Sequence, residues 1–407
     1  MISIWSIAAL APVFWGLLMG GDFTQKFYKP PRRAALWTYR YRWGFIGLSA
    51  MLLSFGFWQF GGGSHTWALT LTTMLAVFFA FAGFFVVPYV IFPTFTHRIP
   101  WKPALEISSD ELSDNDEVIG LEINGDARAY PVSWIVRPHV VHDTVGGEPI
   151  AMTYCGLSHL ARSFGSKENN GQLRFQVYLQ IENNLVLYDN ESHGFVQQIE
   201  GTLDGGKSAG RQLTEYPSRI MSWKSWRNLY PHTRVFYNPA CSSLDRGVRR
   251  LVQKILGHQF NADTPYFPTI KRFDSRLHPK APVIGLLING RPKAYGLDFL
   301  RKHMVINDTV AGKPVLVVHD PVTEVTEVFQ RPEKDGGAME IDAASSGHGF
   351  KLFCKATGTE WNIKGEVVKG DGQALQPKAH ASKILWMIWY NFYPHTELAF
   401  DRISLLQ

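Results

Sequence analysis

Three apolar stretches near the N-terminus constrain the fold of this chain more than any other feature. They are Ile2–Met19, Gly44–Phe60 and Trp67–Phe92, and the second and third contain no charged residue. A spanning helix needs about 20 apolar residues, because the hydrocarbon core is about 30 Å thick and a helix rises about 1.5 Å per residue. Backbone polar groups have no water partner in the bilayer, so such segments cross it as helices. We therefore predict a membrane protein with about three transmembrane helices within residues 1–95.

The basic residues predict how these helices are oriented. The loop between the first two stretches contains Lys26, Lys29, Arg32, Arg33, Arg40 and Arg42, against Asp22 alone. The turn Gly61–Thr66 contains no lysine or arginine. Because positively charged loops stay in the cytoplasm, we predict a multi-pass protein of the cell membrane whose soluble region is cytoplasmic. A periplasmic location is the alternative.

The charge of the whole chain points to lipids rather than nucleic acids as a partner. The formal net charge is +6, and the basic loop accounts for most of it, so the rest of the chain is close to neutral. A nucleic-acid-binding protein needs its positive charge on a folded face, so we exclude that class. Trp58 and Trp67, at the ends of two stretches, suit the membrane interface. The three cysteines are far apart and odd in number, which argues against a disulfide framework.

The remainder of the chain contains an internal duplication. Val118–Phe164 and Val283–Phe329 align without a gap at an offset of 165 residues. Two further blocks match, namely Ser192–Phe195 with Gly347–Phe350 and Trp226–Thr233 with Trp389–Thr396. We predict two related units, at residues 102–240 and 267–402.

Each unit is predicted to be β-rich (α+β). Asn124-Gly125 and Asn289-Gly290 separate short apolar runs, and Asn-Gly is the strongest short signal for a β-hairpin because both residues accept positive φ. Helical patterns occur only near the end of each unit. The linker, residues 241–266, contains a basic amphipathic helix at Asp245–Phe260, which either packs on a domain or lies on the membrane surface.

The region after the apolar stretches contains several specific motifs, namely Asp116–Gly125, Ala129–Pro131, His142–Gly147, Thr153–Cys155 and Asp274–Lys280. By these motifs the chain, over about residues 100–402, resembles the bacterial DUF3179 family, whose members are uncharacterised. It implies an exported or membrane-attached protein without an established activity.

The chain departs from the family pattern where chemistry is most expected. Pro138 replaces the family's histidine, with His139 one position later, and Ser158 replaces the second cysteine of the family's Tyr-Cys-Pro-Leu-Cys. A Cys-x-x-Cys pair is therefore absent from the sequence. The second unit keeps a histidine, His303, but has Asp320 at the position that matches Cys155.

One cluster of residues predicts a metal site in the first unit. Its members are His139, His142, Cys155, His159 and His193. Imidazole and thiolate are ligands for copper or zinc, and a Pro149–Cys155 strand beside His142 would bring several together. The second unit offers no thiol at the matching position and is predicted to stay empty. The alternative is that these residues are half-buried polar side chains of a β-sheet.

The same residues allow an enzyme hypothesis. Cys155 would be the nucleophile, served by His142 or His159 and oriented by Asp143. Asp143-Thr-Val recurs as Asp308-Thr-Val, which favours a role in shaping the turn. The chain has no phosphate-binding loop, hydrolase elbow or dinucleotide-binding fingerprint.

These observations favour one function over another. We expect a membrane-anchored accessory or scaffolding subunit that needs no cofactor and binds membrane lipids and other membrane-protein subunits or further copies of itself. The alternative is a copper- or zinc-binding or thiol-dependent enzyme with its site in the first unit.

Overall fold

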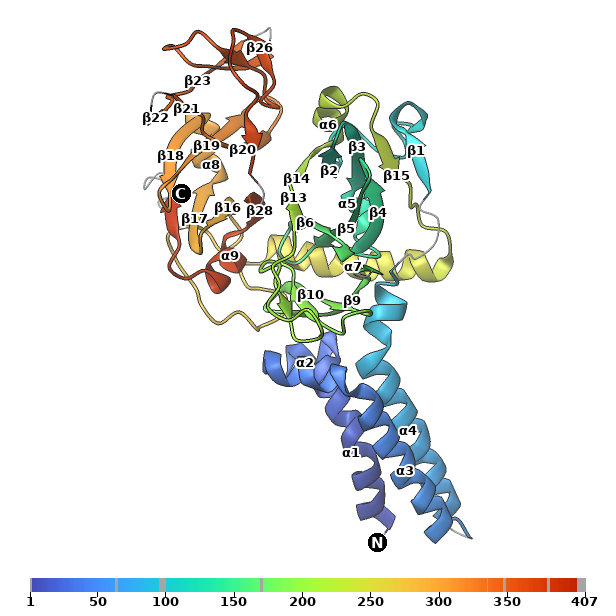
Figure 1. Ribbon diagram of the computed structural model, residues 1–407. Coiled ribbons are helices and arrows are strands. Elements are labelled where there is room, and N and C mark those ends of the chain that lie inside the picture. The colour runs from blue at the N-terminus through green and yellow to red at the C-terminus, as the bar shows by residue number, and fades with distance from the viewer. Residues whose placement is uncertain are drawn as a thin grey trace.

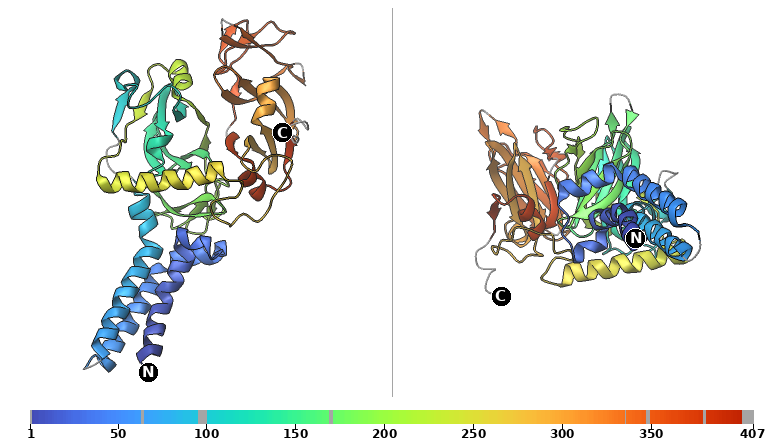
Figure 2. Two further views of the ribbon diagram at one scale, coloured as in Figure 1. Left: turned by 180° about the vertical axis from the view of Figure 1, so that it is seen from behind. Right: turned by 90° about the horizontal axis from the view of Figure 1, so that it is seen from below.

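A helix bundle and two β-rich lobes make up the molecule (Figure 1). The computed structural model describes residues 2–62, 65–94, 100–168, 171–334, 336–346, 349–378 and 381–400. The N-terminal lobe comprises residues 100–240 and stands above the bundle, and the C-terminal lobe, residues 267–400, lies beside it (Figure 2). The linker helix α7 (Ser243–Asn261) runs crosswise to the bundle (Figure 2).

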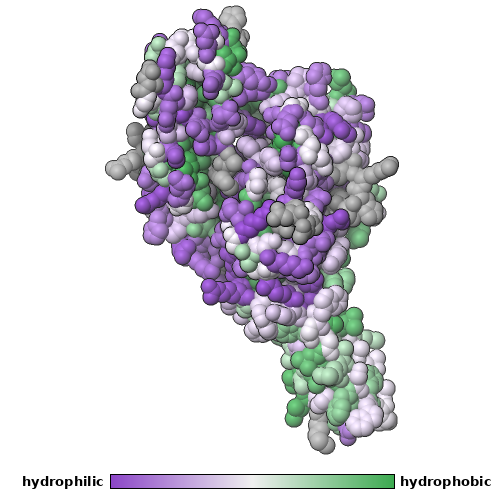
Figure 3. Space-filling view, in the orientation of Figure 1, coloured by the Kyte–Doolittle hydropathy of each residue, from purple (hydrophilic) through white to green (hydrophobic). Residues whose placement is uncertain are grey.

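Three apolar helices form the bundle. They are α1 (Ile2–Gly20), α3 (Arg42–Phe60) and α4 (Thr66–Phe84). The bundle surface is largely apolar, in contrast to the hydrophilic surface of the lobes (Figure 3). The short helices η1 (Asp22–Lys26) and α2 (Arg32–Arg40) connect α1 to α3 at the end nearest the lobes.

The prediction of three spanning helices is wrong in number. Among the described residues, α3 and α4 are the two helices that could cross a membrane by length and composition, and the apolar part of α1 counted in this search, Ile4–Gly20, is shorter. The predicted third stretch is also not one helix, because α4 ends at Phe84 and the π-helix η3 (Val86–Ile91) follows. Pro88 lies in η3, and proline cannot donate the backbone hydrogen bond that an α-helix requires.

The N-terminal lobe contains three larger sheets and one small hairpin. The first sheet has the order β1 (Trp101–Pro103), β15 (Arg234–Phe236), β3 (Asp126–Pro131), β2 (Glu117–Ile123) and β14 (Ser218–Ser222). The second is β13 (Glu215–Tyr216), β6 (Leu160–Gly165), β5 (Glu148–Cys155) and β4 (Val140–Val145). The third is β12 (Leu203–Asp204), β11 (Phe195–Gln197), β10 (Asn184–Asp189) and β9 (Phe175–Ile181), and β7 (Lys167–Glu168) pairs with β8 (Gly171–Gln172).

The C-terminal lobe has a corresponding set of sheets. The first has the order β28 (Ala381–Leu385), β16 (Pro282–Ile288), β17 (Arg291–Gly296) and β29 (Glu397–Ala399). The second is β18 (Val305–Val310), β19 (Lys313–Asp320), β20 (Val325–Gln330) and β27 (Gln376–Pro377). The third is β23 (Asp342–Ser346), β24 (Gly349–Phe353), β25 (Glu360–Trp361) and β26 (Val367–Lys369), and β21 (Glu333–Lys334) pairs with β22 (Gly337–Ala338). In each lobe, the strand of the first sheet that comes last along the chain pairs in parallel with its neighbour. These pairs are β15 with β3 and β29 with β17.

Short helices join these strands. They are η4 (Ala104–Glu106), α5 (Val132–Ile135) and α6 (Trp223–Leu229) in the N-terminal lobe, and α8 (Leu297–His303) and α9 (Trp386–Phe392) in the C-terminal lobe. Asn124-Gly125 and Asn289-Gly290 form the β2–β3 and β16–β17 hairpin turns, with positive φ at all four residues. Ser242 caps α7 by accepting the amide of Asp245 at 3.1 Å.

The bundle and the N-terminal lobe share one hydrophobic core. Tyr39 of α2 and Phe84 of α4 are buried together with Tyr178, Tyr188 and Phe195 of β9, β10 and β11. The rings of Tyr39 and Tyr178 lie with their centroids 4.0 Å apart. The lobe is therefore packed directly onto the bundle rather than connected to it only by the chain.

Candidate functional site

His139 and His142, the first two predicted metal ligands, have different neighbours. His139 has a φ of 74° and stacks on Phe92, with ring centroids 3.9 Å apart. Burial lowers its pKa to about 3, so the imidazole is neutral. His142 lies on β4, where its Nε2 is 3.0 Å from the carbonyl oxygen of Phe175, and burial lowers its pKa as well.

The other two histidines are also held separately. His159 has its Nδ1 3.2 Å from the hydroxyl of Tyr154 and its Nε2 3.3 Å from Glu117. His193 has its Nδ1 2.8 Å from the hydroxyl of Tyr188, near the bundle. Tyr154 is also a ring neighbour of His139, with centroids 6.3 Å apart, but the hydrogen-bond partners of His142, His159 and His193 all differ.

Cys155 is fully buried and has polar neighbours other than histidine. Its Sγ lies 3.8 Å from both Gln180 Oε1 and the carbonyl oxygen of Asn183. Burial raises the pKa of the thiol, which disfavours the thiolate that a nucleophile or metal ligand requires. The hairpin register places His142 opposite Ala151, four residues before Cys155, and therefore roughly 13 Å along the strand.

The predicted ligand set therefore does not assemble. Across the part of the chain that the structure describes, no group of three or more His, Cys, Asp or Glu side chains could hold a metal ion. The residues lie on different elements: His142 is on β4, His159 follows β5 and His193 follows β10.

Asp143 takes part in a structural contact that recurs in the second lobe. Its Oδ2 accepts the hydroxyl of Tyr130 at 2.9 Å, and its Oδ1 accepts the amide of Thr144 at 2.7 Å. Asp308 accepts Tyr295 at 2.8 Å and its own following amide at 2.7 Å. These bonds account for Asp-Thr-Val at both places without a catalytic role.

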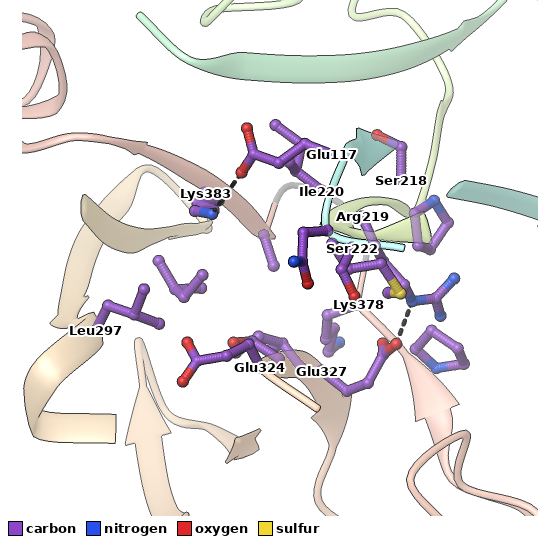
Figure 4. A pocket seen from close by; sticks show the side chains of 18 residues that line it. Glu117, Ser218, Arg219, Ile220, Ser222, Leu297, Glu324, Glu327, Lys378 and Lys383 are labelled. Carbon is purple, nitrogen blue, oxygen red and sulfur yellow. Dashed lines mark hydrogen bonds and ion pairs between the residues drawn. The ribbon is translucent and has the colours of Figure 1, made fainter. Parts of the chain in front are cut away.

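A cleft of about 260 Å³ lies between the two lobes (Figure 4). Its walls include β14 and β28, which are the edge strands of the first sheet in each lobe, and residues of β20. The lining combines apolar side chains with acids and bases, and each charged pair shown in Figure 4 joins one lobe to the other.

In one of these pairs the acid contacts two basic side chains. Lys383 of β28 lies 3.2 Å from Glu117 of β2, which also contacts His159. Burial alone would raise the pKa of Glu117, but hydrogen bonds and charge from His159 and Lys383 outweigh burial and lower it to about 2. Glu117 is therefore ionised at neutral pH and bridges the lobes.

The second pair is more deeply buried. Arg219 of β14 forms an ion pair with Glu327 of β20, and their side chains are only 12% and 6% exposed. Burial raises the pKa of Glu327, while the Arg219 charge opposes the shift. Glu324 at the same cleft is paired with Arg301 at 2.7 Å. Each of the three acids that line the cleft, Glu117, Glu324 and Glu327, is thus paired with a basic side chain.

Comparison with known proteins supports the resemblance seen in the sequence. A family model described as a protein of unknown function, DUF3179, matches residues 86–396. The chain belongs to the DUF3179 family. No curated protein and no solved structure matches the chain. Family membership thus identifies the chain's relatives without assigning a reaction.

The cleft residues were missed by sequence reasoning. Glu117 and Lys383 are 266 positions apart, so no local spacing connects them. A weaker signal is present: Arg219 and Glu327 are charged residues within short strands, and each is followed by an apolar residue, Ile220 or Val328. A charge at such a position needs a buried partner.

Proposed function

We propose that this protein is a membrane-anchored accessory or scaffolding subunit, whose helix bundle holds the two lobes in a fixed position beside the membrane. The observation that carries the proposal is the core shared by the bundle and the N-terminal lobe. A flexible linker is enough to keep a soluble domain near the membrane. A hydrophobic core shared with the membrane helices also restricts the motion of the domain and fixes its orientation relative to those helices.

Polar contacts at the junction support the same proposal. Tyr178 donates its hydroxyl to the carbonyl of Ala35 at 3.0 Å, and Gln176 Nε2 donates to the hydroxyl of Tyr39 at 2.9 Å. Arg32 makes a two-nitrogen contact with Glu200, at 2.9 and 3.2 Å. These directional bonds select one orientation of the lobe on the bundle.

We also propose that the two lobes are copies of one ancestral unit. Matching strand orders support this, and so does the backbone. Positive φ recurs at the offset of 165 in Asn124 and Asn289, in His139 and Met304, and in His159 and Glu324. Only the conformation is common to the last two pairs, because the residue types differ.

The proposed partners are other membrane-protein subunits or further copies of this chain. The cleft between the lobes is the surface best suited to receive a segment of such a partner, since two edge strands border it. Edge strands present unpaired backbone donors and acceptors on one side.

The soluble lobes are proposed to face the cytoplasm, with the periplasm as the alternative. Gly62 lies in the turn between α3 and α4, and a side chain there would meet no atom within 4 Å. Cys241 is an exposed native thiol in the soluble region. A membrane-impermeant maleimide applied to intact cells should label a Gly62→Cys variant at the new cysteine and leave Cys241 unlabelled until lysis. Labelling of Cys241 in intact cells would assign the lobes to the periplasm.

The proposed function is tested by the assembly state of the tagged full chain at native expression. Mild extraction followed by native mass spectrometry should show a defined complex with another integral membrane protein or a homo-oligomer. A monomer that carries one copper or zinc ion, or whose Cys155 reacts readily, would instead support the enzyme alternative, which the buried thiol and separated histidines do not favour.

A further inference from the structure

A group of basic side chains surrounds the end of the bundle nearest the lobes. We call Lys29, Arg33, Arg40 and Arg42 the basic collar. They lie on or beside α2, which crosses that end of the bundle (Figure 1). The apolar helices α3 and α4 begin or end at the same level, so the collar adjoins the apolar surface (Figure 3).

The collar has no acidic partner among the residues that the structure describes. Arg32, next to it, is neutralised by Glu200. Lys29 and Arg33 are exposed and make no ion pair or hydrogen bond with any described residue. Two free cations therefore face outward from the start of α2.

Arg40 and Arg42 are positioned by neutral groups. Arg40 reaches the carbonyl oxygens of His193 and Asp204, both at 3.4 Å. Arg42 donates to the carbonyl of Tyr39 at 2.9 Å and lies over the rings of Tyr39 and Tyr188. These contacts hold the guanidinium groups in place without cancelling their charge.

Exposed aromatic side chains accompany the collar. Trp37, Tyr41 and Trp43 are 55%, 52% and 63% exposed. Rings of this kind, beside basic residues and at the end of apolar helices, are typical of the depth at which lipid headgroups lie. The apolar surface of the bundle is thus followed, toward the lobes, by exposed aromatic rings and then by the cations of the basic collar.

We propose that the basic collar binds the phosphate groups of anionic phospholipids in the leaflet around this end of the bundle. Lysine and arginine next to a bilayer attract anionic lipids, and arginine also forms paired hydrogen bonds with phosphate. Because Arg40 and Arg42 touch β10, β12 and the loop after β10, a bound headgroup would lie at the junction between the bundle and the lobe. This inference rests on the membrane anchoring proposed above but not on any protein partner.

The test uses the full chain in nanodiscs of phosphatidylcholine, with and without phosphatidylglycerol. Native mass spectrometry counts the lipids that stay bound when the protein is released. Wild type should retain phosphatidylglycerol preferentially, and less of it at high salt. A Lys29→Gln/Arg33→Gln variant should lose about fivefold in this preference for each charge removed.

A matched variant makes the result specific. Arg291→Gln/Lys313→Gln removes the same charge from exposed positions of β17 and β19 in the C-terminal lobe, and it should keep the wild-type preference. Equal loss in both variants, or no preference in wild type, would overturn the proposal. Displacement of the bound lipid by inorganic phosphate would also overturn it, by pointing to a site for the free ion. Failure of wild type to enter nanodiscs would instead overturn the membrane anchoring, and this inference with it.

Discussion

Asp22 is the buried acid at the junction between the bundle and the N-terminal lobe. It lies just beyond the end of α1, and its Oδ1 accepts the backbone amide of Gln180 at 2.9 Å and the side chain of Gln25 at 3.3 Å. Its side chain is almost fully buried, and burial raises its pKa from 3.8 to about 7, although the Gln180 amide opposes the shift. In the folded protein this acid is therefore mostly protonated below about pH 7.

This shift predicts a pH dependence of stability. The pKa of Asp22 is higher in the folded protein than in the unfolded chain, so its protonation stabilises the fold. This contribution is complete below pH 3.8 and is lost as the pH rises through about 7. The difference corresponds to on the order of 4 kcal/mol. Asp22→Asn keeps an acceptor for Gln180 and should remove this dependence, so that the variant gains stability relative to wild type near pH 8. Thermal unfolding in nanodiscs between pH 4 and 8 measures the effect. The exposed Asp110→Asn serves as the control, and parallel wild-type and Asp22→Asn profiles would contradict the assignment.

Individual residue roles were only partly predictable from the sequence. Asp143 was expected to shape its turn, and its hydrogen bonds to Tyr130 and Thr144 fit that expectation. The histidines looked like a cluster because they are near in sequence. They are separated because β4, the turn after β5 and the loop after β10 carry them to different parts of the lobe, which spacing along the chain does not reveal.

At the scale of elements, two edge strands determine how the lobes meet. β14 carries Arg219 to Glu327 of the other lobe, and β28 carries Lys383 to Glu117. The two ion pairs differ in solvent exposure, since the first is almost buried and the second is 24% and 38% exposed. Removing one partner of a buried ion pair strongly destabilises the fold, because the other charge stays buried without a partner. An exposed ion pair contributes little to the free energy of unfolding.

This difference predicts unequal effects of mutation. Glu327→Gln leaves the Arg219 charge buried without its partner and should destabilise the protein by about 3 kcal/mol. The double variant Arg219→Met/Glu327→Met should lie within about 1 kcal/mol of wild type, and Lys383→Met should also cost less than about 1 kcal/mol. Denaturant unfolding followed by tryptophan fluorescence gives these values. A neutral effect of Glu327→Gln would show that the pair does not hold the lobes together.

Elements were predictable where the signal is local. Asn124-Gly125 and Asn289-Gly290 form the expected hairpin turns, and the expected linker helix at Asp245–Phe260 lies within α7. The apolar stretch that was expected to run to Phe92 breaks after Phe84, because apolar composition alone does not distinguish a continuous helix from one followed by a proline-containing π-helix.

For the molecule as a whole, the decisive feature is the shared core. Tyr39 and Tyr178 are far apart in the sequence and follow no common period, so the sequence offered no sign that they stack. The same holds for the cleft between the lobes. Long-range packing of this kind depends on the complete fold, whereas the division into an apolar N-terminal region and a β-rich remainder depends only on composition and pattern.

The lobes should be held rigidly on the bundle, and one distance measurement tests this rigidity directly. Spin labels on the exposed native Cys241 and on a Ser54→Cys substitution in α3 allow double electron–electron resonance in nanodiscs, because Cys155 and Cys354 are buried. Wild type should give one narrow distance distribution. Tyr178→Ala removes both the stack on Tyr39 and the bond to Ala35 and should broaden it, while Tyr390→Ala in the C-terminal lobe should not. A broad or multiple distribution in wild type would show that the lobes are only tethered and would contradict the account.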